Sequence, residues 1–175
     1  MDRTRDLVFE RCRWDEIPPD EEDVFGWGTD LFGVQAYELQ WATPEWRFLM
    51  RIDSNPVVHI AVLGRTVTVG GRTETVGGMS RLVTVPQLRS QGLATLALNH
   101  AAQFVANELG LAFAMGFCVD HMVPFYRERG WQQVDARVMI EQPTGNRLSP
   151  CICLVLPCGA REWPPGDVDV CGLPW

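Results

Sequence analysis

The chain has 175 residues, of which 46% are apolar and 10% aromatic, a composition that excludes a disordered chain and fits one folded domain. Its formal net charge of −7 argues against nonspecific binding to nucleic acid, and no apolar run is long enough to span a membrane. All fifteen basic residues are arginine, which excludes the phosphate loops and Schiff bases that require a lysine.

The first half of the chain predicts mostly strands. Residues 5–14 alternate weakly and predict an edge strand, and the acidic, proline-broken residues 15–23 predict a loop that leads into a helix near residues 24–28. A short helical segment follows at about residues 34–41. Three antiparallel strands then form a meander over residues 45–53, 56–71 and 73–85. Gly77 and Gly78 inside the third strand indicate a bulge or a close approach of another chain segment.

The second half alternates between helix and strand. The apolar spacing of residues 91–109 predicts a long helix, and the continuous apolar run at residues 111–119 predicts a buried strand in parallel pairing. A short helix at residues 120–130 and strands near residues 131–141 and 151–156 follow. We expect a single domain over residues 1–175, with the proline- and glycine-rich tail, residues 158–175, as an extension over the surface.

Cysteine and histidine usage gives no sign of a metal site. Six cysteines are present without a C-x-x-C pair, and the three histidines are scattered, so we expect no metal. Cys151 and Cys153 fall on one face of a predicted strand, where we interpret them as buried, reduced thiols. The N-terminal residues lack the apolar core of a signal peptide, so we expect a cytoplasmic protein.

The junction between the third strand and the long helix favours anion binding. Successive N–H groups at a helix N-terminus lack intrahelical partners, and the helix dipole adds partial positive charge. Gly92 and Ala94 keep bulky side chains away from these amides, and Arg89 adds a fixed charge. This arrangement suits a phosphate or pyrophosphate, although an ordinary helix start with an exposed arginine remains the alternative.

Two motifs give the chain a family resemblance. The segment Arg89-x-x-Gly92-x-Ala94 after a strand resembles the Q/R-x-x-G-x-G/A motif of the GNAT superfamily of N-acetyltransferases, and Phe125-Tyr126 followed by Gly130-Trp131 resembles its F-Y-x-x-x-G-F segment. The resemblance covers about residues 57–134. It implies an α/β (α+β) fold: a mixed, mostly antiparallel sheet of about seven strands, splayed between the fourth and fifth strands and flanked by about four helices.

The resemblance also implies an enzyme that uses acetyl-CoA as acyl donor for a primary amine. The pyrophosphate of the donor would bind at Arg89, Ser90, Gln91, Gly92, Leu93, Ala94 and Thr95. Its pantetheine arm would pair with the backbone of Leu82, Val83, Thr84 and Val85. A backbone N–H near Val83 would stabilise the developing oxyanion, and Tyr126 matches the family position that protonates the leaving thiolate. A packed aromatic with its hydroxyl at the surface is the alternative for Tyr126.

The general base is not identified by the motifs. Many relatives carry a glutamate on the fourth strand, whereas residues 77–81 contain no carboxylate. Either water deprotonates the ammonium group, or a carboxylate reaches the site from elsewhere. Asp30 and Glu38 are the candidates, because the resemblance implies that the segment after the first strand borders the acceptor; two solvated loop carboxylates are the alternative.

Two subfamilies suggest the acceptor. Pro143-Thr144-Gly145 and a tail of the form Trp163-x-x-Gly166-Asp167 ending in Trp175 resemble aminoglycoside 2'-N-acetyltransferases, which implies that Asp167, or Asp169, and Trp175 help hold an amino sugar. The tail is longer than in that family, and Trp175 could instead staple it to the core. The segment from Glu162 to Gly166 also resembles nodulation-type N-acyltransferases, which take a fatty acyl group from a carrier protein and load it onto a chitooligosaccharide amine.

Both resemblances point to a small-molecule amine on a sugar, and the acidic protein favours a cationic acceptor. We expect neither nucleic acid nor a membrane as partner. Another small amine as acceptor and a noncatalytic acyl-CoA sensor remain as alternatives. The sequence is also compatible with a homodimer, because exposed tryptophans such as Trp27 and Trp41 would suit either a pocket wall or a dimer contact.

Overall fold

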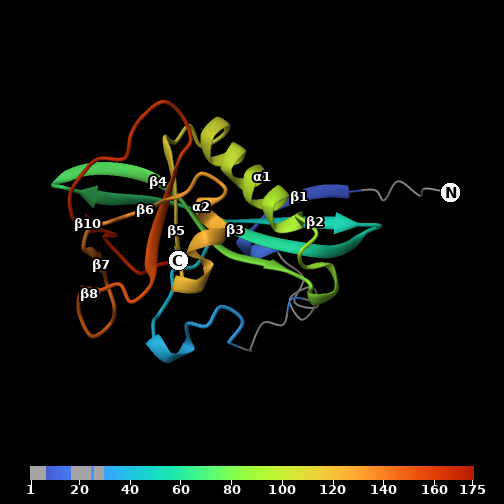
Figure 1. Ribbon diagram of the computed structural model, residues 1–175, viewed down its shortest axis with the longest axis horizontal. Helices are drawn as coiled ribbons and strands as arrows, with labels where there is room; N and C mark the ends of the chain where they lie inside the picture. The colour runs from blue at the N-terminus through green and yellow to red at the C-terminus, as the bar shows by residue number, and fades with distance from the viewer. Residues whose placement is uncertain (1–6, 17–24, 26–29) are drawn as a thin grey trace.

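The computed structural model describes residues 7–16, 25 and 30–175 and shows one curled sheet with a long helix packed against it (Figure 1). The helix predicted near residues 24–28 lies outside the described residues, apart from Phe25. No helix in the described part of the chain has the length and apolar character needed to cross a membrane.

The sheet contains ten strands among the described residues, three more than predicted. The additional strands are short segments from residues 132–148 and from the tail. The strands are β1 (Leu7–Arg13), β2 (Trp46–Ile52), β3 (Asn55–Val69), β4 (Arg72–Thr84), β5 (Phe113–Cys118), β6 (Gln132–Gln133), β7 (Val138–Ile140), β8 (Arg147–Leu148), β9 (Ile152–Pro157) and β10 (Val168–Asp169). They pair in the order β6-β9-β5-β4-β3-β10-β7-β8, and β2 pairs with both β3 and the edge strand β1.

The predicted meander is present as β2, β3 and β4. All three strands pair in antiparallel fashion, and residues 70–71 turn the chain between β3 and β4 with both glycines at positive φ. The register of the β3–β4 pair shifts by one residue between His59 and Ala61. Opposite this shift, Arg81 has a φ of +54°, so the bulge lies at Arg81 and not at the glycines of β4.

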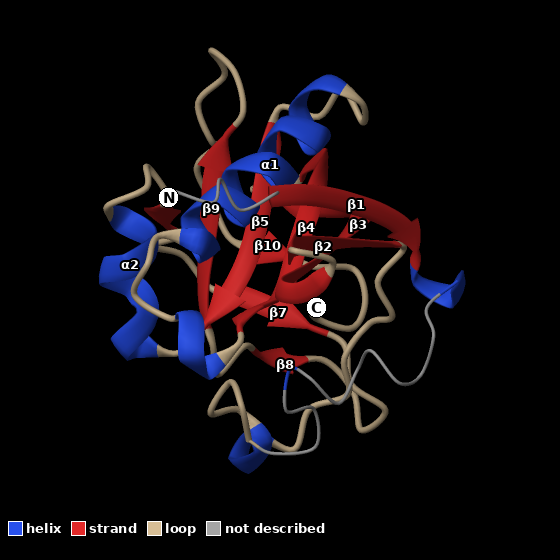
Figure 2. Cartoon of the chain, turned by 90° about the vertical axis from the view of Figure 1, so that its right-hand side faces the viewer, coloured by secondary structure: helices blue, strands red, loops and turns tan. Residues whose placement is uncertain are grey.

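Helix α1 (Leu93–Asn107) lies across β3 and β4, and helix α2 (Val123–Arg127) is a short helix after β5 (Figures 1 and 2). The apolar face of α1 meets the sheet through contacts such as Phe104 against Phe48, whose ring centroids are 5.1 Å apart. Four 3₁₀ helices complete the described elements: η1 (Trp14–Glu16), η4 (Gln35–Tyr37), η5 (Pro86–Leu88) and η6 (Asp120–Met122). The segment predicted as helical over residues 34–41 forms only one turn, because Glu38 ends it in the left-handed conformation.

Strands β4 and β5 run parallel over three residue pairs and then separate. Gly77, Gly78 and Met79 face Ala114, Met115 and Gly116, and no pairing is found beyond Gly116 in these described strands. The Arg81 bulge follows two residues after the last pair and bends β4 away. The predicted splay between the fourth and fifth strands is therefore present.

The end of the C-terminal tail, from Val168 to Trp175, is part of the core, which corrects the expectation of a surface extension for these residues, whereas residues 158–167 are exposed or half-buried. Strand β10 inserts between β3 and β7, pairing antiparallel with the first and parallel with the second. Val168, Val170 and Trp175 are buried in a second apolar cluster on the sheet. The apolar residues of the tail alternate with polar ones from position 168 to 170, which is a strand pattern that the surrounding prolines and glycines obscure.

Candidate active site

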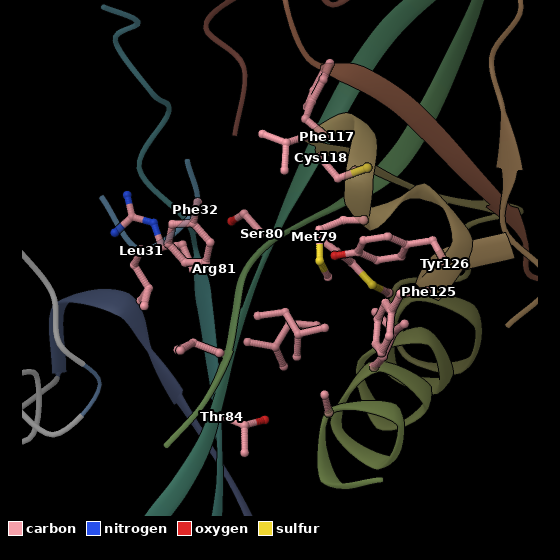
Figure 3. Close-up of a pocket in the computed structure, with 18 of the residues that line it drawn as sticks. Leu31, Phe32, Met79, Ser80, Arg81, Thr84, Phe117, Cys118, Phe125 and Tyr126 are labelled. Carbon is pink, nitrogen blue, oxygen red and sulfur yellow. The ribbon is translucent and has the colours of Figure 1, made fainter. Parts of the chain in front are cut away.

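A cavity of about 1020 Å³ opens where β4 and β5 separate. Its walls come from the N-terminus of α1, the free edge of β4, the end of β5, α2, the segment 30–34 and the last residue of the chain. Figure 3 shows Tyr126 and Phe125 on one side of β4 and Leu31, Phe32 and Arg81 on the other. The cavity thus reaches from the helix N-terminus past the splay to the segment that follows β1.

The N-terminus of α1 has the features expected of an anion site. Its N-cap is Gly92, with a φ of +80° and no side-chain cap, and Ser90 also has a positive φ of +61°. The first helical bonds run from the amides of Thr95 and Leu96 to the Gly92 carbonyl, at 3.1 and 3.2 Å. The amides that precede Thr95 are therefore not used within the helix.

Arg89 lies between this N-terminus and the β4 edge. Its Nε donates to the Thr84 carbonyl at 3.2 Å, which fixes the guanidinium beside the cavity. An extended backbone at Arg89, with a φ of −65° and a ψ of 159°, carries the chain from η5 into the helix. The side chain is thus held near the unused amides by a backbone contact and keeps its remaining donors for a ligand.

Arg129 is a second cationic side chain at the helix N-terminus, and it lies at a position that the two sequence motifs leave unspecified. Its Nε donates to the Thr95 hydroxyl at 2.8 Å, a guanidinium nitrogen contacts the Phe125 carbonyl, and the guanidinium lies 3.8 Å from the centroid of the Phe125 ring. Arg129 follows α2, 34 residues after Thr95. Only the packing of α2 beside α1 brings them together, and no local motif signals it.

The structure places most of the predicted donor-binding residues on the cavity. Val85 and Gln91 do not line it. The Thr95 hydroxyl lines the cavity but already accepts from Arg129. The predicted residues that line the cavity are Leu82, Val83, Thr84, Arg89, Ser90, Gly92, Leu93, Ala94 and Thr95.

Pairing within the sheet decides which amides of β4 face the gap. In an antiparallel ladder the N–H and C=O of one residue point to the same side, and successive residues alternate. The Val85 amide donates to the Val57 carbonyl at 3.0 Å. Val83 lies two residues earlier, opposite His59, so its N–H group also points toward β3. Leu82 and Thr84 therefore direct their N–H groups away from β3, toward the gap. The oxyanion role predicted near Val83 fits these two neighbours and not the amide of Val83 itself.

Two hydroxyl groups on β4 have no hydrogen-bond partner among the described residues. These are the buried Oγ1 of Thr84 and the buried Oγ of Ser80, and both residues line the cavity. Buried hydroxyls normally have a partner, so a bound ligand or water is the expected partner for each.

Tyr126 lies in an aromatic and apolar environment at the splay. Its ring packs edge-on against Trp131 and Phe125, with centroids 5.4 and 5.1 Å apart, and its hydroxyl points toward Met79 on β4 (Figure 3). Burial, and then the neighbouring Cys118, raise the pKa of Tyr126 well above its ordinary value of 10.0. The phenol is therefore protonated at neutral pH and can act as a proton donor.

The cavity wall also holds two thiols, Cys118 and Cys151. Burial raises the pKa of each to about 11. Both are free, buried and protonated at neutral pH, which makes them poor nucleophiles for a nearby thioester. Cys153 is also buried and free, in agreement with the reduced thiols predicted for this strand.

The four predicted acceptor-binding residues separate into two groups. Asp30 and Trp175 line the cavity, whereas Glu38 and Asp167 do not. Asp167 instead accepts from the Arg137 amide at 3.1 Å, at a different hollow of the sheet. The carboxylate of Asp30 accepts from the amides of Val34 and Gln35, at 2.8 and 3.1 Å, and this shapes the turn that borders the cavity.

Trp175 forms the floor of the cavity. It is 4% exposed, and its indole N–H donates to the Met115 carbonyl at 3.1 Å. Two further polar residues of the cavity wall, Arg81 and His121, were not singled out from the sequence. His121 follows β5 at the exposed rim, next to Asp120 and Met122 in η6.

Solved structures with the same fold include GNAT acetyltransferases. The N-acetyltransferase YhbS from Escherichia coli, crystallised with CoA, matches with a TM-score of 0.62 and 18% identity over 97% of this chain and 92% of that one. A GNAT acetyltransferase from Brucella melitensis, crystallised with acetyl-CoA, matches with a TM-score of 0.53 and 14% identity over 92% and 94%. FeeM, an N-acyl amino acid synthase from uncultured soil microbes, gives 0.56 and 13% over 89% and 92%. These likenesses confirm the predicted fold class.

Sequence comparison identifies the family. No curated protein sequence matches the chain. The family model described as nodulation protein A (NodA) matches residues 29–172, which include the N-terminus of α1, Tyr126 and most of the tail. The chain therefore belongs to the nodulation protein A (NodA) family, built on the GNAT fold.

Proposed function

We propose that the chain is an acyl-CoA-dependent N-acyltransferase that transfers the acetyl group of acetyl-CoA to a primary amine on a sugar. One observation carries the proposal: the N-terminus of α1, the free edge of β4 and the hydroxyl of Tyr126 open into one cavity. The family match supports it, as do GNAT structures described with CoA or acetyl-CoA bound.

The donor lies with its pyrophosphate on the amides before Thr95, between the guanidinium groups of Arg89 and Arg129. Unused amides and the helix dipole stabilise the negative charge, and the two arginines add charge-assisted hydrogen bonds. The pantetheine arm follows the free edge of β4, where it exchanges hydrogen bonds with Leu82 and Thr84. The thioester then reaches the gap beside Tyr126.

Transfer proceeds by direct attack. The neutral amine attacks the thioester carbon, a C–N bond forms, and charge develops on the carbonyl oxygen. The Leu82 amide stabilises this oxygen, because it faces the gap after the bulge. The C–S bond then breaks, and Tyr126 gives its proton to the departing thiolate. The proton lost by the amine passes to a base, and the phenolate is reprotonated from solvent.

The base is either a water molecule or one of two side chains at the acceptor end. Among the described residues, Asp30 provides the carboxylate side chain that lines the cavity, and His121 provides the imidazole. One oxygen of Asp30 already accepts two backbone N–H groups. The buried hydroxyl of Ser80, without a partner among the described residues, provides a site for a relaying water.

The family favours an acceptor of the chitooligosaccharide type over an aminoglycoside. The charge of the cavity agrees with this choice. The side chains of its described lining include Arg81, Arg89 and Arg129 but a single carboxylate side chain, that of Asp30, which suits one ammonium group better than a polycation. The aromatic walls near Phe32, Trp41 and Phe117 offer apolar faces for sugar rings. A carrier-protein thioester is the alternative donor that the same family suggests.

Free-thiol release tests the proposal. The protein is incubated with acetyl-CoA and, in turn, a chitooligosaccharide with one free amine, a panel of aminoglycosides, and simple alkyl amines. Thiol release with the chitooligosaccharide supports the proposal. Release with aminoglycosides alone would identify the acceptor as an aminoglycoside, as the resemblance to aminoglycoside 2'-N-acetyltransferases implies. Binding of acetyl-CoA without thiol release from any donor, including an acyl carrier protein thioester, indicates a sensor.

A further inference from the structure

A buried histidine lies directly behind the bulge that opens the site. His59 on β3 has no solvent exposure, and its Nδ1 lies 2.7 Å from the carbonyl oxygen of Arg81. We propose that His59 is a positioning residue, whose hydrogen bond holds the Arg81 peptide so that the Leu82 and Thr84 amides face the thioester. This inference rests on the proposed function.

The direction of the hydrogen bond follows from its partner. A carbonyl oxygen can only accept, so Nδ1 must carry the proton. The ring is uncharged at neutral pH, because burial, together with the charges of Arg47 and Arg81, lowers the pKa of His59 to about 3. The rings of Trp14 and Phe25 pack around it, with centroids 6.2 and 5.7 Å from that of the imidazole. His59 is therefore a neutral donor held in one orientation.

The peptide that His59 holds is an unfavourable one. Arg81 adopts a φ of +54°, in the left-handed region that residues with a side chain rarely occupy. Such a conformation persists only where the surroundings favour it, and the hydrogen bond to the Arg81 carbonyl supplies that preference. Neighbouring residues of β4 pair regularly with β3 on both sides of the bulge.

The bulge decides which amides of β4 are available to a ligand. Before it, Ala61 faces Ser80; after it, His59 faces Val83, so one extra residue lies on β4. Without that residue the alternation would continue unbroken, and every later N–H would point to the opposite side. Val83 would then face the gap, and Leu82 and Thr84 would face β3. The His59 contact therefore controls the atoms that meet the thioester oxygen and the pantetheine arm.

Two substitutions separate positioning from packing. His59→Leu keeps an apolar side chain of similar size but has no donor. His59→Asn places a side-chain N–H close to the position of Nδ1. We expect His59→Leu to lower kcat at least about tenfold, since one oxyanion donor is worth about 10²–10³ in kcat. The acceptor KM should change less than about twofold, and His59→Asn should recover most of kcat.

The control is His100→Leu, because His100 stacks on Phe9 and lies outside the cavity. It should leave kcat unchanged. The proposal is overturned if folded His59→Leu turns over like the wild type, or if His59→Asn is as impaired as His59→Leu. Circular dichroism and thermal unfolding establish that each variant is folded.

A measurement on the wild type keeps the test independent of activity and of the folding of the variants. Long-range ¹H–¹⁵N correlations report which imidazole nitrogen carries the proton. We expect protonated Nδ1, together with slow hydrogen exchange at Val83 and faster exchange at Leu82 and Thr84. A proton on Nε2, or protection at Leu82 and Thr84, overturns the inference. If no acceptor releases thiol, the proposed function fails, while this measurement still decides whether His59 donates to the Arg81 carbonyl and which amides of β4 face away from β3.

Discussion

The indole of Trp175, the last residue, lies against the backbone of Gly78: a Cβ at Gly78 would come within 2.5 Å of its Cε2 atom. The same indole donates to the Met115 carbonyl on β5. Gly78 and Met115 are themselves paired across β4 and β5, next to the last pair before the splay. The C-terminus thus covers the point from which the two strands diverge.

This contact predicts that Gly78→Ala destabilises the protein. The added methyl group must displace the indole and disturb its hydrogen bond, and such overpacking costs about 1–3 kcal/mol. Urea unfolding measures the change. Gly64→Ala is a matched control on β3, because a Cβ there meets nothing within 4 Å, and it should change stability by less than about 0.5 kcal/mol. Equal effects of the two substitutions would show that the indole contact contributes nothing.

Tyr126→Phe should reduce turnover at least about tenfold and leave CoA binding nearly unchanged, because it removes the proton donor and keeps the packing against Trp131. Thiol release and calorimetric CoA binding measure the two effects. Tyr37→Phe, the same substitution at the second tyrosine, lies outside the cavity and should be neutral. Turnover at the wild-type level in Tyr126→Phe would remove the proton-donor role.

The raised pKa of Tyr126 predicts the shape of the pH profile. A proton donor loses activity as pH rises through its pKa, and burial moves that pKa above the ordinary 10.0. Wild-type kcat should therefore show no decline attributable to this group up to about pH 10. A decline near neutral pH that disappears in Tyr126→Phe would contradict the assignment.

Arg89→Gln should weaken CoA binding about tenfold, since a hydrogen bond to a charged group contributes about 1.5–3 kcal/mol and the exposed position favours the lower value. The effect should shrink as ionic strength rises, because salt screens exposed charges. Arg147→Gln, on the exposed strand β8, is the control for loss of one positive charge. An equal loss of affinity in both variants would indicate only a long-range charge effect.

His59 predicts that stability falls at acidic pH. Its pKa is about 3 in the folded protein and 6.5 when exposed, so below pH 6.5 the unfolded chain binds a proton that the folded chain does not. The stability that this difference contributes is complete above about pH 6.5 and is lost progressively down to about pH 3. Between about pH 7 and pH 5.5 the loss should be on the order of 1 kcal/mol.

The comparison with His59→Asn isolates this contribution, since Asn does not titrate and the carboxylates remain the same. Urea unfolding at both pH values should give a smaller loss in the variant than in the wild type. The same pH dependence in the two proteins would place the imidazole in a solvated environment and contradict its burial.

The sequence by itself determined the parts of the site that depend on neighbouring residues. The strand before Arg89 and the helical pattern after Gly92 predicted a helix N-terminus with exposed amides at this place, because a helix leaves its first amides without intrahelical partners wherever it forms. The residues from Asp120 to Gly130 predicted a short helix that contains Tyr126, and the apolar run before it predicted the parallel strand β5.

Only the tertiary structure decided the contacts between segments far apart in the chain. Arg129 reaches Thr95, Trp175 reaches Gly78, and His59 holds Arg81, and each pair depends on how elements pack and not on any local pattern. Which N–H groups of β4 face the gap depends on a single inserted residue. A change of one residue in register reverses the direction in which every later N–H group of the strand points. Residue spacing along one strand does not reveal such a change, because register is a property of the pair of strands.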